Sequence, residues 1–170
     1  MMHTTLILTV LGSDHPGLVK SLSEVLNQQQ GNWTESRMVH LGGQFAGLLQ
    51  VALPRERVAN LKAALDVLQD NGLKVLIAET SETPAATKTL KVELLGLDRP
   101  GIIRDITTQL ASLRVNIEEL FSEQRPAPMS GGTLFFAALN LSLPDGVSAE
   151  QVQTKLEELS DQLMVDLNFA

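Results

Sequence analysis

The sequence predicts an α+β protein built from two tandem copies of one small unit, each with the element order β-α-β-β-α-β. The motif Gly-x-Asp-x-Pro-Gly occurs twice, starting at Gly12 and at Gly96. An apolar stretch with strand character precedes both copies, and an apolar stripe at helical spacing follows both. The period of this repeat, 96 minus 12, is longer than the units of solenoid proteins and indicates a duplicated small domain.

In the first copy, four stretches are rich in β-branched and aliphatic residues, and two stretches between them carry apolar residues at helical spacing. Gly42-Gly43 is the turn of a hairpin. Pro54 ends the following strand because it cannot donate to a sheet ladder, and Asn71-Gly72 closes the second helix. The predicted strands cover residues 4–11, 33–41, 44–53 and 73–78. The predicted helices carry their apolar stripes on Leu18, Val19, Leu22, Val25 and Leu26, and on Val58, Leu61, Leu65 and Leu68.

The second copy repeats this order after residues 81–87, which read as a linker, so the predicted domains are residues 1–80 and 88–170. Ser148 and Gln151 form a capping box for its second helix. The offset between the matching prolines, 144 minus 54, exceeds that of the motif by six, and this insertion falls in residues 125–132. The Pro and Gly content there predicts a longer, mobile hairpin loop. The order is ferredoxin-like, with antiparallel strands backed by two helices. The predicted strands cover residues 89–95, 116–123, 133–143 and 163–169.

Composition excludes several classes of function. The formal net charge is −7 and no cluster of Lys and Arg is present, which argues against direct binding of nucleic acid or of an anionic membrane surface. The chain has no cysteine, so disulfides, thiolate metal sites and a Cys nucleophile are excluded. The apolar run near the N-terminus is too short for a signal peptide or a membrane span. We therefore expect a soluble cytoplasmic protein.

Residues for catalysis or for metal binding do not form a recognisable pattern. His3, His15 and His40 lack the spacing of metal ligands. Ser13, Asp14 and His15 are adjacent in the sequence, which is not the geometry of a catalytic triad, and no Gly-x-Ser-x-Gly motif occurs. We therefore expect no catalytic residues, no metal and no cofactor.

The loop between the first strand and the first helix of each copy is the candidate site. The motif Pro suits the first turn of the helix, the preceding Asp is placed to cap free amides, and the motif Gly lets a ligand approach the backbone. Such a helix N-terminus can hold a small carboxylate. An Asn begins the next strand and is expected near the loop, where its amide offers both a donor and an acceptor. A capped helix start without a ligand explains the same motif equally well. The candidate ligand-binding residues are Gly12, Asp14, Pro16, Gly17, Asn32, Gly96, Asp98, Arg99, Pro100, Gly101 and Asn116.

These residues also carry a family resemblance. The second motif, extended to Gly-x-Asp-Arg-Pro-Gly-Ile-Ile and followed by a helix and Asn116-Ile117-Glu118-Glu119, resembles an ACT domain. Two such units without a catalytic domain resemble the family of glycine cleavage system transcriptional repressors. The first unit departs from the pattern, because His15 stands where Arg99 does and Trp33 replaces the aliphatic Ile117. It is interpreted as the structural or partner-facing half.

The resemblance implies an amino-acid-responsive, non-catalytic regulator with tandem ACT-type domains and glycine or a similar amino acid as effector. It implies action through a partner transcription factor rather than by direct DNA contact. The exposed sheet edges expected in the duplicated units could also pair across chains, which is compatible with a homodimer. Two alternatives remain open. One is an ACT-type regulatory subunit of an enzyme of amino-acid metabolism. The other is a small ferredoxin-like acyl-phosphate hydrolase that uses Arg99 and Asn116.

Overall fold

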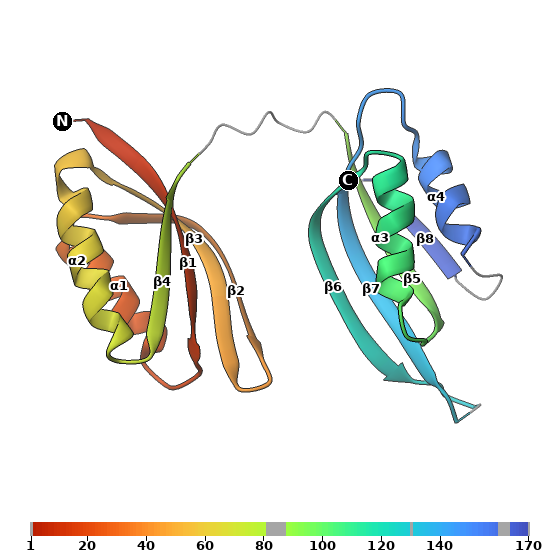
Figure 1. Ribbon diagram of the computed structural model, residues 1–170, viewed down its shortest axis with the longest axis horizontal. Coiled ribbons are helices and arrows are strands. Elements are labelled where there is room, and N and C mark those ends of the chain that lie inside the picture. The colour runs from red at the N-terminus through yellow and green to blue at the C-terminus, as the bar shows by residue number, and fades with distance from the viewer. Residues whose placement is uncertain (1, 81–87, 130, 160–163, 170) are drawn as a thin grey trace. The chain divides into compact units, whose positions relative to one another are not determined.

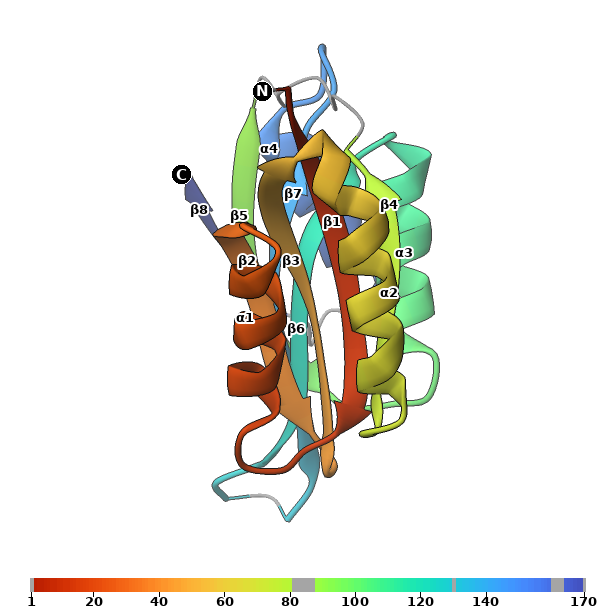
Figure 2. The same ribbon diagram turned by 90° about the vertical axis from the view of Figure 1, so that its left-hand side faces the viewer.

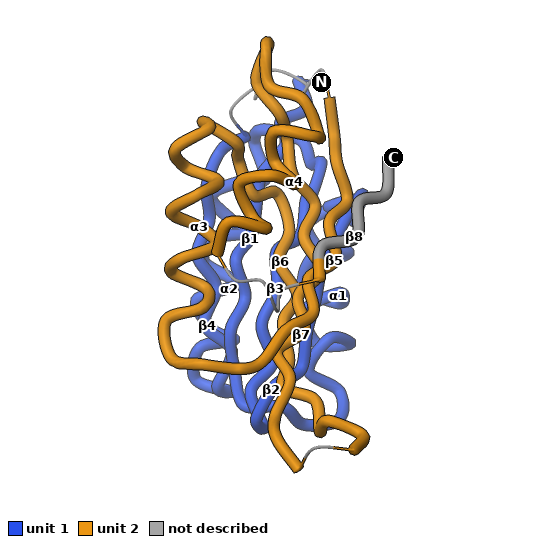
Figure 3. The backbone as a smooth tube through the Cα atoms, turned by 90° about the vertical axis from the view of Figure 1, so that its right-hand side faces the viewer, with its two compact units in different colours: residues 1–83 blue, residues 84–170 orange. Residues whose placement is uncertain are grey.

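The structure is a computed structural model that describes residues 2–80, 88–129, 131–159 and 164–169 (Figure 1). The chain divides into two compact units, Met1–Thr83 and Pro84–Ala170, which Figure 3 shows in blue and orange. The boundary between them falls within the stretch predicted as a linker, residues 81–87, which lies outside the described residues. Each unit is described by itself.

Unit 1 is a four-stranded antiparallel sheet in the order β2-β3-β1-β4. Figure 2 shows its two helices side by side on one face of this sheet. The unit contains in addition a short 3-10 helix, Arg55–Arg57, which the sequence pattern did not predict. The elements are β1 (His3–Ser13), α1 (Leu18–Gln28), β2 (Asn32–Leu41), β3 (Gln44–Pro54), α2 (Val58–Gln69) and β4 (Leu73–Glu79).

Unit 2 repeats the same architecture with the sheet order β6-β7-β5-β8 and two helices. The predicted fold class, two tandem ferredoxin-like units of β-α-β-β-α-β order, is therefore confirmed. The capping box predicted at Ser148 is also present, because its Oγ accepts from the amide of Gln151. The elements are β5 (Thr89–Leu97), α3 (Ile102–Ser112), β6 (Asn116–Pro126), β7 (Thr133–Ser142), α4 (Ala149–Glu157) and β8 (Met164–Phe169).

The core of each unit lies between the sheet and its helices. Alternate residues of the central strand and the i, i+4 stripe of the first helix are buried there, at positions that correspond in the two units. Burial of one such aliphatic side chain contributes about 1.5–3 kcal/mol to stability. In unit 1 these residues are Leu6, Leu8, Val10, Leu18, Leu22 and Leu26. In unit 2 they are Leu90, Val92, Leu94, Ile102, Ile106 and Leu110.

The hairpins of the two units differ as the insertion predicts. In unit 1, Leu41 pairs with Gln44, so the turn is Gly42-Gly43. In unit 2, the last pair is Pro126 with Thr133, and a longer loop follows β6. The longer loop is confirmed, although residue 130 lies outside the described residues.

Candidate functional site

The motif folds into a tight turn just before the helix in both units. The amide of Ile102 donates to the carbonyl of Arg99 at 3.4 Å, and Gly101 has φ 83° and ψ 4°. Leu18 donates to His15 in the same way, and Gly17 has φ 90° and ψ −3°. These are the features of a type II turn with Pro at its second position and Gly at its third. The Pro-Gly pair is therefore explained by the turn, which needs the left-handed conformation that glycine adopts without strain.

Two expectations about this motif are wrong. Pro16 and Pro100 do not lie in the first helical turn, because α1 and α3 begin two residues later, after the glycines that form the N-cap positions. Asp14 and Asp98 do not cap the helices, since neither helix has a side-chain cap at its N-terminus. The turn places each Asp three residues ahead of the N-cap, and its carboxylate reaches sideways to the hairpin.

The partner of each motif Asp is a residue that the sequence analysis missed. Gln124 on β6 donates from Nε2 to Oδ2 of Asp98 at 2.6 Å. In unit 1, His40 on β2 lies with its Nε2 3.6 Å from Oδ2 of Asp14. The separation of His40 and Gln124 in the sequence (124 minus 40) equals the period of the motif itself. This spacing was the available signal, but nothing in the local sequence marks either residue as a partner of the loop.

The backbone fastens the loop to the hairpin at a second point. The amide of Asp98 donates to the carbonyl of Thr133 at 3.0 Å, and the amide of Asp14 donates to Gly43 at 3.1 Å. The loop between the first strand and the first helix is thus held against the end of the hairpin in both units. Its position depends on contacts that are distant in sequence.

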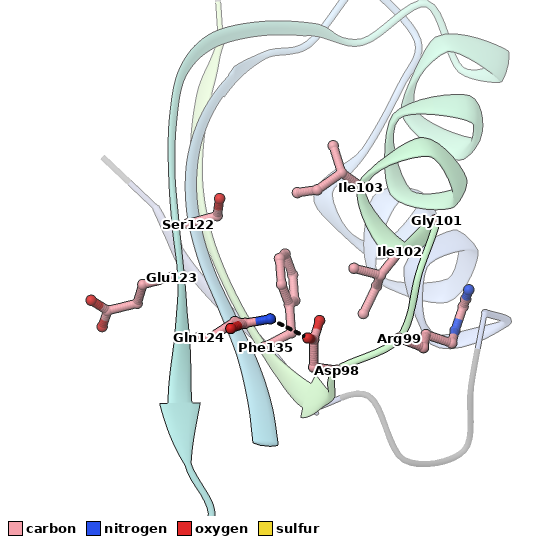
Figure 4. A pocket seen from close by; sticks show the side chains of 9 residues that line it. All are labelled: Asp98, Arg99, Gly101, Ile102, Ile103, Ser122, Glu123, Gln124 and Phe135. Carbon is pink, nitrogen blue, oxygen red and sulfur yellow. Dashed lines mark hydrogen bonds between the residues drawn. The ribbon is translucent and has the colours of Figure 1, made fainter. Parts of the chain in front are cut away.

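A pocket of about 410 Å³ lies between this loop, the first turn of α3 and β6 in unit 2 (Figure 4). This volume lies in the range of small-molecule sites. Ser122 and Gln124 project from β6 toward α3, whereas Glu123 projects to the other side of the strand. Ile103 and the buried ring of Phe135 supply apolar walls. The pocket therefore combines apolar walls with the Asp98 carboxylate and the Gln124 amide at one end.

Arg99 borders this pocket, but its side chain extends away from β6 (Figure 4). Its Nη1 lies 2.7 Å from Oδ2 of Asp105, one turn into α3. The hydrogen bond from Arg99, together with a second one from Arg104, lowers the pKa of the Asp105 carboxyl below its ordinary value. In this structure Arg99 therefore fixes the loop to the helix, and an anionic ligand would compete with Asp105 for its guanidinium.

We expect the substitution Arg99→Gln to raise the pKa of Asp105 toward its ordinary value, because it removes the largest cause of the lowering. An NMR pH titration of the Asp105 carboxyl measures this. Arg104→Gln is the control and should raise the pKa less. The carboxylate stabilises the folded state above its ordinary pKa, and this contribution is lost as the pH falls through the lowered folded-state pKa. An unchanged pKa in Arg99→Gln would contradict the assignment.

The expectation that Asn116 lies beside the loop is wrong. It pairs with Ser142, which pairs with Thr89 at the far end of β5. Leu97, at the loop end, is eight residues further along β5 (97 minus 89), or about 26 Å at the rise of a strand. The reason is the topology, since α3 carries the chain away from the loop before β6 begins. Arg99 and Asn116, on which the hydrolase alternative depended, are thus not brought together.

Asn32 occupies the corresponding place in unit 1. It pairs with Ala52, which pairs with Thr5, while Gly12 lies seven residues further along β1 (12 minus 5). At the strand rise this is about 23 Å. Asn32 therefore also lies at the sheet end opposite the loop.

Asn116 instead belongs to a polar cluster at its own end of the sheet. Its Nδ2 donates to Oε1 of Glu118 at 2.7 Å, and the hydroxyl of Ser142 donates to the same oxygen at 2.8 Å. Both hydrogen bonds lower the pKa of the Glu118 carboxyl, and the one from Asn116 is the larger cause. This arrangement gives Asn116 a structural role in the pairing of β6 with β7.

The first motif glycines, Gly12 and Gly96, are buried near the ends of β1 and β5. A Cβ at Gly12 would lie 2.6 Å from the carbonyl oxygen of Gly72. Gly12 is therefore required for the close approach of two backbones, and it does not face solvent.

Among the described residues, no group of three or more His, Cys, Asp or Glu side chains is placed to hold a metal ion. None of the described helices has the length and apolar character needed to cross a membrane.

Comparison with known proteins agrees with this architecture. Residues 4–77 match the family model described as ACT domain. The glycine cleavage system transcriptional repressor of Escherichia coli (strain K12) is 23% identical over 162 residues, which cover 93% of this chain and 85% of the repressor. The repressor of the same description from Shigella flexneri gives the same values.

Two solved structures share the fold along the whole chain. An unknown protein from Galdieria sulphuraria is 28% identical with a TM-score of 0.83, and the match covers 99% of each chain. A crystal structure provisionally assigned as a glycine cleavage system transcriptional repressor is 19% identical with a TM-score of 0.72, and the match covers 100% of each chain.

Proposed function

We propose that this chain, a tandem ACT-domain protein that resembles the glycine cleavage system transcriptional repressors, is a non-catalytic regulator that responds to a small amino acid. The similarity to the repressors over 93% of the chain supports a regulatory role. The observation that carries the proposed ligand response is the pocket at the motif loop of unit 2. Glycine or a similar amino acid is the effector that the resemblance suggests.

The chemistry of the pocket fits the two charged groups of an amino acid. The Asp98 carboxylate can accept hydrogen bonds from an ammonium group, in exchange for the one it accepts from Gln124. The N-terminal amides of α3, which follow Gly101, favour a carboxylate. Binding at this point would change how firmly the loop is held against the hairpin. The reason is that Asp98 on the loop and Gln124 on β6, which hydrogen-bond to each other, both line the pocket.

We propose that the signal passes to a DNA-binding protein partner. The net charge of −7 and the lack of a cluster of Lys and Arg support an indirect route to DNA, because direct binding requires neutralisation of phosphates. The protein would then have two states that differ in affinity for the effector and for the partner, so that binding of one changes the binding of the other. A cytoplasmic location follows from this role. The edge strands β2 and β6 offer backbone groups through which a homodimer can form.

Isothermal titration calorimetry with glycine, serine and alanine on the whole chain tests the proposed ligand response. We expect saturable binding of at least one of them to the wild type, and loss of that binding in Gly101→Val. Gly101 has φ 83°, a conformation that valine adopts only with strain of about 1–3 kcal/mol, so the loop changes shape.

Gly17→Val is the matched control, because it makes the same change in the corresponding turn of unit 1. Circular dichroism verifies that both variants fold. We expect Gly17→Val to retain the binding. Absence of binding to the wild type with all three amino acids would overturn glycine or a similar small amino acid as the effector.

A further inference from the structure

We propose that only unit 2 provides the amino-acid pocket, because Met38 fills its counterpart in unit 1, and that Ser122 leaves room there for the ligand's side chain. This inference rests on the proposed function, since it takes an amino acid to be the ligand. The inference goes beyond the proposed function in three respects. It specifies the unit that binds the amino acid, the position in the fold that decides this, and the kind of amino acid that fits best.

The register of the two sheets establishes which residues correspond. In unit 1, Met38 on β2 pairs with Gly47 on β3. In unit 2, Ser122 on β6 pairs with Ala137 on β7. The separation of Met38 and Ser122 in the sequence (122 minus 38) equals the offset of the motif. The same pairings place Phe45 opposite Gly12 and Phe135 opposite Gly96. Each unit thus has one aromatic ring beside its loop.

Met38 occupies the space on the helix side of its sheet. It is partly buried and packs against the core of unit 1. It also lies across Gly47, since a Cβ built on that glycine would be 2.7 Å from Cγ of Met38 and 2.7 Å from the carbonyl oxygen of Arg37. The Met38 side chain thus takes part of the room that a side chain at position 47 would need. Methionine is suited to this because its flexible chain fits irregular gaps.

Unit 2 has the opposite pair of side chains at this place. Ala137 is fully buried and supplies its own methyl group. Ser122, opposite it, is short and lines the pocket instead of filling it. Figure 4 shows its side chain on the α3 side of β6, above Gln124. The open volume of unit 2 therefore follows from a small residue at the position that Met38 holds in unit 1.

The walls beside Ser122 indicate the preferred ligand. Ile103 projects into the pocket from α3, and Phe135 stands between it and the polar end formed by Asp98 and Gln124. An amino acid with its ammonium group at Asp98 directs its side chain toward these apolar groups. Glycine has no side chain to bury there. An amino acid with an apolar side chain, such as valine, is therefore expected to bind about tenfold more tightly than glycine.

Isothermal titration calorimetry of the full chain with glycine, alanine and valine tests the inference. We expect one site per chain in the wild type. Ser122→Met, which installs the side chain of unit 1, should weaken binding by at least about tenfold, as an obstructed apolar pocket does. Ser122→Ala is the matched control, because it keeps the pocket open, and it should retain binding. Met38→Ala removes the side chain that fills this space in unit 1. It should leave the affinity of the unit 2 site unchanged, and any additional site that it creates should lie in unit 1.

The outcomes separate this inference from the proposed function. Wild-type binding that survives Ser122→Met, that occupies two sites per chain, or that is lost in a folded Met38→Ala variant would overturn the inference and leave the proposed function standing. Equal affinity for glycine and valine would overturn the predicted preference for an apolar side chain. Absence of binding of every amino acid to the wild type would overturn the proposed function together with the inference.

Discussion

The substitution Leu90→Ala is expected to lower the free energy of unfolding of unit 2 by about 2–5 kcal/mol, the range for a buried Leu truncated to Ala. Leu90 lies on the central strand β5 and is only 1% exposed. Its removal leaves a cavity between the sheet and the two helices of unit 2. Urea unfolding followed by circular dichroism measures the loss.

Leu6→Ala makes the same change at the corresponding position of unit 1, where Leu6 is also 1% exposed. The chain's single tryptophan, Trp33, packs against the core of unit 1, so its fluorescence reports the unfolding of that unit. We expect the Trp33 transition to shift to lower urea in Leu6→Ala, because the truncated side chain lies in the core that Trp33 contacts. An unshifted transition in Leu6→Ala would contradict the placement of Leu6 in that core.

The substitution Gly12→Ala is expected to destabilise unit 1 by about 1–3 kcal/mol, although it adds only one methyl group. The added Cβ would lie 2.6 Å from the carbonyl oxygen of Gly72, and that contact is with backbone, which cannot rotate away as a side chain can. To relieve it, β1 must move away from the turn that leads into β4. The unfolding of unit 1, again followed by Trp33 fluorescence, measures the effect.

Thr9→Ala is the control for this experiment. Thr9 lies on the same strand, but it is exposed, so its truncation should change stability by no more than about 0.5 kcal/mol. Wild-type stability in Gly12→Ala would show that the two backbones do not approach as closely as described. The motif glycine would then be available for contact with a ligand instead of being fixed by packing.

The repeated motif determined most of the fold. Strand and helix patterns are local, and each was present twice, so the order of elements followed from the sequence. The longer hairpin loop of unit 2 was also predicted from the repeat. Comparison of the two copies places six additional residues in the hairpin of the second copy. The turn at Gly101 was misjudged in detail, since Pro-Gly before a helix suits either a first helical turn or a type II turn.

The site was predicted only in part. The loop that borders the pocket was identified, because its glycine and proline mark a special backbone conformation. Gln124 was missed, since it reaches Asp98 only after the chain has formed α3 and returned along β6. Asn116 was placed wrongly beside the loop, although it lies at the start of β6, at the other end of the sheet.

The sequence by itself thus determined the elements, their order, their duplication and the position of the loop, because these depend on residues that are neighbours in the chain. Only the tertiary structure decided which side chains face the loop. Strand pairing brings Ser122 opposite Ala137 in unit 2 and Met38 opposite Gly47 in unit 1. Because protein interiors are closely packed, the combined volume of such a pair determines whether space remains beside the loop. No local sequence pattern shows which two residues form the pair.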